Sequence, residues 1–446
     1  MNPPPPVLAV RRGRSPNCSA TGTIVGSALL SLVAAGAVVN AFAHRFARWR
    51  DEDQDDDGDA PPPRLRREGK SAWLAWALPP ALLQLTPEAA AAALERGAVE
   101  VGTSMDHDAP LEVHLALTER CPAACEGCYL DAQPGSGAEA DRAALESDLE
   151  QLAQMGVFEV AIGGGEALLH PDTLPIIDKV IEVGMVPNLT ISGFGLTPTI
   201  ARELAAKVGQ VNVSFDGPEH VGVRRWRTTP LFERTIRVLR EAGVRVGVNT
   251  VLTRGLIPHL ADMATHLHAL GIEEWQWLRY KPAGRAQRNF EEHRPTPEQL
   301  EGLWPQLLSL EAATGLRFRI DCALVPFLAH HAPPIEALER LAVSGCSAGD
   351  TLWSRGADGR FTPCSFAHHQ NVGDGWAGDP ISGWTHDPTL TSWRQRATDP
   401  PEPCASCDYQ HICRGGCRIV AHHDTGDALA PDPDCPRVRT FRAVQA

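Results

Sequence analysis

Cysteine is the residue type that offers this chain the most chemistry. The sequence has 446 residues and 12 cysteines, three of which stand in the series Cys121-x3-Cys125-x2-Cys128. Thiols this close together in a long chain are typical of metal ligands rather than of disulfides. Three thiolates on one short loop can hold three corners of a cubane iron–sulfur cluster and leave the fourth iron open to a ligand. The same three cysteines with a fourth ligand from elsewhere could instead bind zinc.

A second set of seven cysteines lies near the C-terminal end. Twelve residues separate Cys346 from Gly359, and four separate Gly359 from Cys364. The four cysteines from Cys404 to Cys417 have the form C-x2-C-x5-C-x3-C. The members are Cys346, Cys364, Cys404, Cys407, Cys413, Cys417 and Cys435. Periodic apolar signals fade after Cys346 while Gly, Pro and Asp become frequent. We therefore expect this region to be organised around metal.

The residues between the two sets alternate between short β-rich runs and amphipathic helical stretches. The predicted strands are 112–117, 158–163, 188–192, 211–215, 245–252 and 274–280, and the helices between them are 140–154, 172–183, 199–207, 232–241 and 257–270. A further helix is predicted at 296–314 and a strand at 318–321. Short βα connections predict a parallel sheet. The fold class is thus α/β, a partial (β/α)6 TIM-like barrel with its chemistry at the C-terminal ends of the strands.

The first cysteine series resembles the signature of the radical SAM enzymes. It follows the first predicted strand, and an aromatic residue, Tyr129, follows its last cysteine. The resemblance implies a catalytic 4Fe-4S cluster whose open iron binds S-adenosylmethionine (SAM). Reductive cleavage of SAM would then give a 5′-deoxyadenosyl radical that abstracts hydrogen from a substrate.

The resemblance also implies contacts to SAM at the ends of later strands. After the second strand, Gly163-Gly164-Gly165-Glu166 is similar to the family's Gly-Gly-Glu motif, and glycines let backbone approach a ligand closely. After the fourth strand, Ser214-Phe215-Asp216-Gly217 resembles a Ser-x-Asp-Gly element in which Ser214 would face the cofactor carboxylate.

Other polar residues near the strand ends are candidates for the same pocket. One of Arg224, Arg225 and Arg227 could pair with the SAM carboxylate, and we name Arg225 as the candidate. Ser192 stands where relatives often have Thr-Asn-Gly. The remaining candidates are Asn249, Thr250 and Arg279, each of which could equally be structural.

The C-terminal set resembles the SPASM extension of radical SAM enzymes, which holds two auxiliary 4Fe-4S clusters. By position, Cys346, Cys364 and Cys417 would bind the first. The second would be bound by Cys404, Cys407, Cys413 and Cys435. Cys322 is a candidate fourth ligand of the first cluster, and its alternative is a buried free thiol. Cys18 receives no role.

The N-terminal part is predicted to be a leader. Residues 1–70 contain a 21-residue uncharged stretch, 23–43, with arginines on both sides, and then an acidic and proline-rich linker. The stretch could be a membrane anchor, an export signal or a dispensable leader. The predicted domains that follow are a small helical preface at 71–110, the barrel at 111–320 and the SPASM domain at 321–446.

The leading functional hypothesis is a peptide or protein maturase that forms crosslinks or oxidises side chains in ribosomally made peptides. The alternatives are a radical SAM enzyme for a small molecule or cofactor precursor, and a non-catalytic zinc or iron–sulfur protein. Expected partners are the peptide, a low-potential electron donor such as a flavodoxin or ferredoxin, and a separate leader-peptide-binding protein. The formal charge of −14 argues against a nucleic-acid binder. Because SAM and low-potential electron donors are cytosolic, we expect a cytoplasmic location. Residues 23–43 are the one segment predicted to be able to tether the protein to a membrane.

Overall fold

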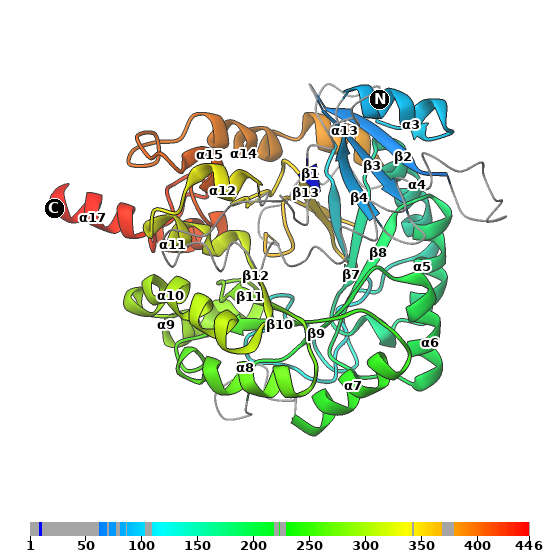
Figure 1. The fold of residues 1–446 in the computed structure, drawn as a ribbon, viewed down its shortest axis with the longest axis horizontal. Coiled ribbons are helices and arrows are strands. Elements are labelled where there is room, and N and C mark those ends of the chain that lie inside the picture. The colour runs from blue at the N-terminus through cyan, green and yellow to red at the C-terminus, as the bar shows by residue number, and fades with distance from the viewer. Residues whose placement is uncertain are drawn as a thin grey trace, which may run out of the picture.

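The computed structural model describes residues 9–10, 62–68, 71–76, 81–85, 87–102, 109–217, 223, 229–340, 343–367 and 379–445. Within them two sheets are formed, a nine-stranded sheet that curves into a partial barrel and a smaller five-stranded sheet near the N-terminus (Figure 1).

The barrel sheet confirms the predicted α/β class. Its order is β12-β11-β10-β9-β8-β7-β6-β13-β14, and neighbours from β6 to β12 are parallel. The strands are β6 Glu112–Ala116, β7 Glu159–Gly163, β8 Val186–Ile191, β9 Val211–Ser214, β10 Val246–Leu252, β11 Glu274–Arg279, β12 Arg317–Ile320, β13 Leu352–Arg355 and β14 Phe361–Thr362. β13 and β14 were not predicted. β13 pairs in parallel with β6, so the sheet crosses the boundary predicted at 320/321.

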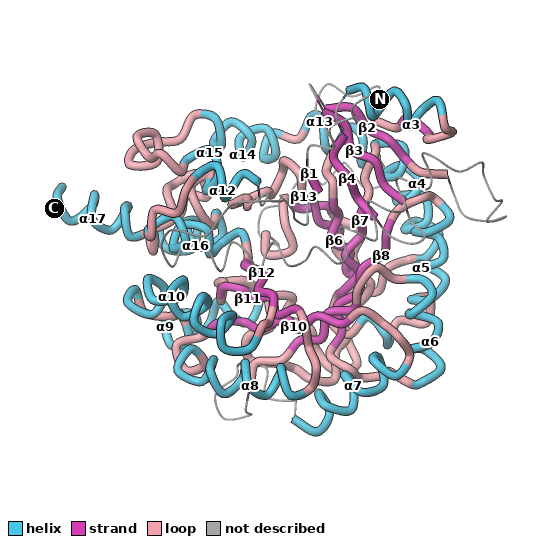
Figure 2. The backbone as a smooth tube through the Cα atoms, in the orientation of Figure 1, coloured by secondary structure: helices cyan, strands magenta, loops and turns pink. Residues whose placement is uncertain are grey.

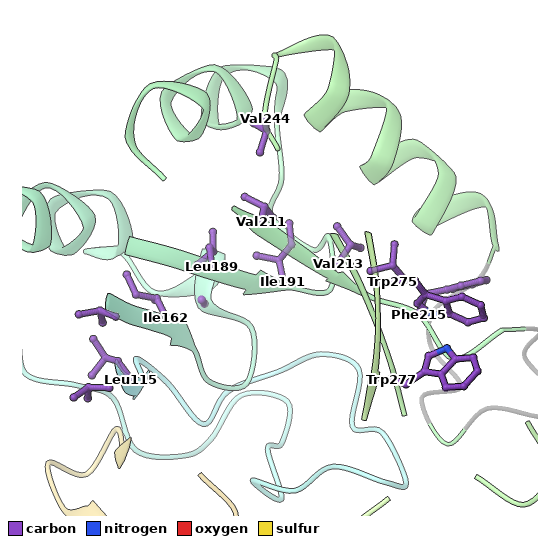
Figure 3. Close-up of a cluster of buried hydrophobic side chains, with 14 of the residues drawn as sticks. Leu115, Ile162, Leu189, Ile191, Val211, Val213, Phe215, Val244, Trp275 and Trp277 are labelled. Atoms are coloured by element: carbon purple, nitrogen blue, oxygen red, sulfur yellow. The ribbon is translucent and has the colours of Figure 1, made fainter. Parts of the chain in front are cut away.

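Helices lie along the outer side of the curved sheet (Figure 2). They are α4 Arg142–Met155, α5 Thr173–Glu182, α6 Pro198–Lys207, α7 Thr229–Glu241, α8 Leu260–Ala269 and α10 Pro297–Thr314. Alternation along the strands separates two environments. In β7, Val160 and Ile162 join the apolar core between sheet and helices, whereas Glu159, Ala161 and Gly163 line the barrel interior. Figure 3 shows part of this core, from Leu115 through Val213 to Trp277.

The C-terminal region consists of short helices joined by cysteine-bearing loops. These are α11 Val325–His330, α12 Ile335–Arg340, α13 Pro380–His386, α14 Pro388–Thr398, α15 Gln410–Cys413, α16 Arg418–Thr425 and α17 Pro436–Gln445. A buried ion pair, Arg355 Nε to Asp148 Oδ2 at 2.5 Å, joins β13 to α4. The region is therefore fastened to the barrel by both strand pairing and charge.

The connections carry the remaining short elements. They are the 3₁₀ helices η1 Ala167–Leu169, η2 Ile257–His259, η3 Gly284–Asn289 and η4 Cys322–Leu324, and the single-turn helix α9 Phe290–His293.

The N-terminal prediction needs a correction. Residues 71–110 do not form a helical preface, and 64–68 is not linker. The small sheet has the order β1-β4-β3-β2-β5, with β1 Ala9–Val10, β2 Arg64–Glu68, β3 Ser71–Trp76, β4 Ala81–Leu85 and β5 Val99–Glu100. The helix predicted around 87–96 is present as α3 Pro87–Glu95.

The basic residues of β2 explain why that segment was taken for a solvated linker. Arg64 and Arg66 are buried rather than solvated. Their guanidinium groups donate to the carbonyl oxygens of Val157 (2.6 Å) and Gly156 (2.9 Å), just beyond α4. Burial, with Arg66 nearby, lowers the pKa of Arg64 to about 10. The positive charges thus dock the small sheet onto the barrel at carbonyls near a helix C-terminus.

The predicted membrane segment 23–43 and Cys18 lie outside the described residues. Among the residues that are described, none belongs to a helix with the length and apolar character needed to span a bilayer.

Candidate active site

A cavity of about 910 Å³ occupies the barrel interior and is lined by inward-facing strand residues and by loops at the C-terminal strand ends. Near the N-terminal ends of the strands, the cavity is lined by a polar network around Glu274. This carboxylate accepts from Gln210 Nε2 (2.8 Å), Arg245 Nη2 (3.0 Å) and Arg319 Nη1 (3.2 Å). These groups line the cavity near the N-terminal ends of β9 to β12, opposite the strand C-termini where the chemistry of such barrels lies.

The first cysteine series forms a loop directly after β6. Cys121 and Cys125 are buried, Cys128 is half-buried, and all three line the cavity. Backbone hydrogen bonds from Cys121 N to Gln133 O (3.0 Å) and from Cys128 N to Cys125 O (3.2 Å) shape the loop. Three thiols on one loop facing a cavity fit the donor set of a 4Fe-4S cluster with one open iron.

The glycine run after β7 lies against this loop. Gly165 N donates to Thr118 O at 2.6 Å, and Gly164 adopts φ +130°. A Cβ on Gly164 would stand 2.6 Å from Thr118 O, and one on Gly165 would stand 2.2 Å from Arg120 O. Side chains are thus excluded at both positions. With Gly163, these glycines line the cavity as predicted.

Glu166 contacts a neighbouring residue rather than the cavity. It is 1% exposed, and its Oε2 accepts from the backbone N of Ser192 at 2.8 Å and from the Ser192 hydroxyl. Ser192, at the end of β8, lines the cavity. Two residues predicted separately as cofactor contacts are therefore one unit in which the carboxylate orients the serine.

The residues predicted on β9 and β10 divide between cavity and scaffold. Ser214 and Asn249 line the cavity. Asp216 is buried, and its Oδ1 accepts from Val251 N at 2.9 Å, which ties the end of β9 to β10. Thr250 donates to Phe215 O (2.7 Å) and is thus structural.

Arg225, with the neighbouring Arg224 and Arg227, lies outside the described residues.

The structure brings Cys322 to the other three cysteines predicted for the first auxiliary cluster. It follows β12, and its thiol interacts electrostatically with those of Cys346 and Cys417. Burial, reinforced by Cys346 and Cys417, raises the pKa of Cys364 to about 12. Burial likewise raises the pKa of Cys417 to about 11. Four adjacent thiols, two buried and two half-buried, fit a fully ligated cluster, and iron binding would release their protons.

The second predicted group is also assembled. Burial raises the pKa of Cys413 well above its usual value, and the thiols of Cys435 and Cys404 add to the shift. Burial similarly raises the pKa of Cys404, with a smaller contribution from Cys407. The Cys404 sulfur also accepts from Arg396 Nη2 at 3.9 Å. Because Cys413 and Cys417 stand on one short loop but belong to different groups, the two sites are tied to each other.

One ion pair at the cavity wall was missed by the sequence analysis. Lys281 Nζ is paired with Asp321 Oδ2, and both residues are buried and line the cavity. Burial lowers the pKa of Lys281, but the Asp321 carboxylate together with the thiols of Cys322 and Cys417 raises this pKa above its ordinary value. The Lys281 ammonium lies 4.2 Å from the centroid of the Phe366 ring. The centroids of the Phe366 and Tyr129 rings are 4.7 Å apart. These contacts connect the first cysteine loop with the region around Cys364, and no local pattern could have revealed them.

Arg279 lines the cavity as predicted but is engaged in a buried ion pair. Its Nη1 is 2.5 Å from Asp432 Oδ2, and its Nη2 is 2.7 Å from Asp434 Oδ2. Asp432 Oδ2 also accepts from Cys417 N at 2.8 Å. Arg279 therefore fixes the C-terminal cysteine loops to the end of β11.

Comparison with known proteins decides the family. Residues 115–267 match the family model described as the Radical SAM superfamily. Residues 115–267 of this chain therefore form a radical SAM domain. The family uses a 4Fe-4S cluster and SAM, so the predicted family, fold class and cofactors are confirmed, and the non-catalytic alternative is excluded. Which residues hold each cofactor stays a prediction.

Relatives extend the similarity beyond the matched segment. The radical SAM enzyme is 28% identical over 345 residues to the mycofactocin maturase MftC of Mycobacterium tuberculosis, covering 74% of this chain and 83% of that one. It is 29% identical over 355 residues to the PqqA peptide cyclase of Xanthomonas euvesicatoria, covering 76% and 90%.

Solved structures show the same fold. SuiB of Streptococcus suis bound to its precursor peptide SuiA matches with a TM-score of 0.61 and 17% identity, over 74% of this chain and 76% of that one. Native anSMEcpe with bound AdoMet and the Cp18Cys peptide matches with a TM-score of 0.59 and 17% identity, over 75% and 96%.

Proposed function

We propose that this radical SAM enzyme is a peptide maturase that abstracts hydrogen from a ribosomally made precursor peptide or protein and oxidises or crosslinks it. The observation that carries the proposal is the shared cavity. The loop with Cys121, Cys125 and Cys128 and the first C-terminal cysteine group, through Cys322, both line it. A substrate held there would lie between a radical source and a group able to take up an electron.

At the catalytic cluster, one set of residues would bind the iron and a second set would contact SAM. Cys121, Cys125 and Cys128 would hold the iron, while the glycines after β7 and the side chains of Ser192, Ser214 and Asn249 would contact SAM. When bound, the reduced cluster and SAM together supply the 5′-deoxyadenosyl radical. The polar network around Glu274 lines the opposite end of the barrel.

The auxiliary clusters would be held by the two C-terminal groups, with Cys322 as the fourth ligand of the first. Cys346, Cys364 and Cys417 complete that site, and Cys404, Cys407, Cys413 and Cys435 form the other. The ion pair of Lys281 and Asp321 places a buried positive charge beside the first group. A cluster with four thiolates carries net negative charge, so this cation would stabilise it.

A peptide substrate is favoured over a small molecule by two observations. The cavity is near the upper end of the roughly 300–1,000 Å³ range of ligand pockets, which leaves space for a substrate side chain beside SAM. The relatives include a PqqA peptide cyclase, and SuiB has been crystallised with a precursor peptide.

The proposed chemistry also implies partners and a location. One-electron reduction of the cluster requires a low-potential donor such as a flavodoxin or ferredoxin, and precursor recognition would use a leader-binding protein. SAM and such donors are cytosolic, so the barrel would face the cytoplasm.

Iron content and SAM cleavage test the radical chemistry. Anaerobically reconstituted protein should hold roughly twelve iron atoms per chain if all three clusters are 4Fe-4S. After reduction with dithionite it should release 5′-deoxyadenosine from SAM, and Cys125→Ala should abolish this release. Cys18→Ala, which removes a cysteine outside every predicted group, is the matched control. Retained turnover in Cys125→Ala would refute the proposed ligands.

The substrate class needs a separate experiment. Short open reading frames encoded beside the gene supply candidate precursor peptides, and the product of a crosslink or oxidation should be about 2 Da lighter by mass spectrometry. Loss of that mass change in Cys125→Ala would link it to the radical. Deoxyadenosine release stimulated by a small metabolite and by none of the peptides would favour the alternative substrate class.

A further inference from the structure

The segment after β11 lies directly on the first cysteine loop. Arg285, in η3, makes four hydrogen bonds to that loop. Its backbone N donates to Cys128 O (2.9 Å), and its Nε donates to Cys125 O (2.7 Å). Its two terminal nitrogens donate to Asp131 Oδ1 (2.7 Å) and Ala132 O (2.8 Å). The side chain therefore reaches acceptors on both sides of Cys128.

The loop needs such support because its backbone departs from ordinary conformations. Ala124 and Asp131 adopt φ of +43° and +54°, in the left-handed region that side chains disfavour. The loop also exposes carbonyl oxygens that no strand or helix satisfies. The guanidinium of Arg285 offers a rigid fork of donors that matches several fixed acceptors at once, which a flexible ammonium group cannot do.

Neighbouring residues of the same segment lie equally close. Gly284 has φ +56°, and a Cβ there would stand 2.4 Å from Tyr129 O. Asn289 Nδ2 donates to Glu126 Oε1 at 3.0 Å, between the second and third cysteines. The cysteine loop is thus shaped from outside, by a segment about 160 residues later in the chain.

We propose that Arg285 is a positioning residue that holds Cys125 and Cys128 in the arrangement that binds the SAM-cleaving cluster. This inference rests on the proposed ligand role of the first cysteine series. Arg285 touches neither the iron nor SAM in this assignment, and it acts by fixing the carbonyls and the carboxylate of the loop.

The test compares three variants of the full-length, anaerobically reconstituted protein. Arg285→Ala removes the guanidinium, and Arg285→Lys keeps a positive charge near Asp131 without the fork. Arg288→Ala is the matched control, because Arg288 lies in the same η3, is 75% exposed and reaches Asp131 Oδ2 only at 3.5 Å. Two readouts are taken, namely hydrogen exchange of residues 121–132 and the change in the EPR spectrum of the reduced cluster when SAM is added.

In Arg285→Ala, exchange in the loop should rise at least about tenfold, a factor worth 1.4 kcal/mol. The SAM-induced EPR change should be lost while exchange in β8 stays at the wild-type rate. Arg285→Lys should be intermediate in both readouts, and Arg288→Ala should match wild type.

Two outcomes would overturn the inference. One is an Arg285→Ala protein whose loop exchange and EPR response equal those of Arg288→Ala. The other is an Arg285→Lys protein whose loop exchange and EPR response equal those of wild type. This second outcome decides the question if Arg285→Ala does not fold. A wild-type protein that shows no SAM-induced EPR change would instead refute the proposed function, which distinguishes the two failures.

Discussion

Replacing Asp432 by asparagine removes the negative charge from a buried ion pair that joins β11 to the C-terminal cysteine loops. The side chains of Arg279 and Asp432 are 1% and 0% exposed. Both carboxylate oxygens accept from Arg279, at 2.5 and 3.1 Å, and Oδ2 also accepts from the backbone N of Cys417. The substitution keeps the size of the side chain and one acceptor oxygen while removing the charge.

The expected cost follows from what remains around Arg279. Breaking a buried ion pair by removing one partner costs about 3–5 kcal/mol. Asp434 stays 2.7 Å from Arg279 Nη2 and compensates part of the positive charge. We therefore expect the lower end, about 3 kcal/mol, which corresponds to a rise of roughly 100-fold in the opening equilibrium at 1.4 kcal/mol per factor of ten.

Hydrogen exchange at the Cys417 amide measures this opening directly. The asparagine oxygen can still accept from that amide, while its NH2 group replaces the Oδ1 acceptor of Arg279 Nη2 and Asp434 N. Faster exchange therefore reports the weakened attachment to Arg279 and not the loss of the acceptor for the Cys417 amide itself. Asp399→Asn, which makes the same charge change at an exposed position of the C-terminal region, is the control. If Cys417 exchanged at the same rate in both variants, the ion pair would not be what fixes the cysteine loops to the barrel.

Three further predictions follow from the site. Replacing both Cys322 and Cys346 by alanine should lower the reconstituted iron content from about twelve to about eight atoms per chain, measured colorimetrically, because the first auxiliary cluster keeps only two of its four thiolates. Glu166→Ala should weaken SAM binding by about tenfold or more in equilibrium dialysis, since the amide and hydroxyl of Ser192 lose their buried acceptor at a cost of about 1–3 kcal/mol. Burial raises the pKa of Glu311 to about 7 in the folded protein, from its ordinary value of 4.5. Its contribution to stability is fully present below the unfolded pKa near 4.5, where the carboxyl group is protonated in both states, and is lost as pH rises through 7. Glu311→Gln should therefore raise the melting temperature relative to wild type at pH 8 and leave it unchanged at pH 4, and an equal shift at both pH values would contradict the assignment.

The parts of the fold that the sequence predicted well depend on local pattern. Alternation of β-rich and helical runs predicted the parallel strands β6 to β11, because each run buries one face in a core whose period is visible in the sequence. The N-terminal sheet was missed because Arg64 and Arg66 were interpreted as solvated charges. Carbonyl oxygens of distant segments, including those at the end of α4 about 90 residues away, make their burial possible.

The sequence by itself identified the family and its cofactors by resemblance, since Cys121, Cys125 and Cys128 and the glycine run each lie within a single loop at the position of a family motif. Tertiary structure decided what brings the sites together. It placed Cys322 beside Cys417, paired Arg279 with a carboxylate 153 positions later, and set Arg285 against the first cysteine loop. These contacts join segments that are ordinary in themselves. They exist only because the curved sheet returns distant strand ends to one edge, where burial requires every charge to find a partner.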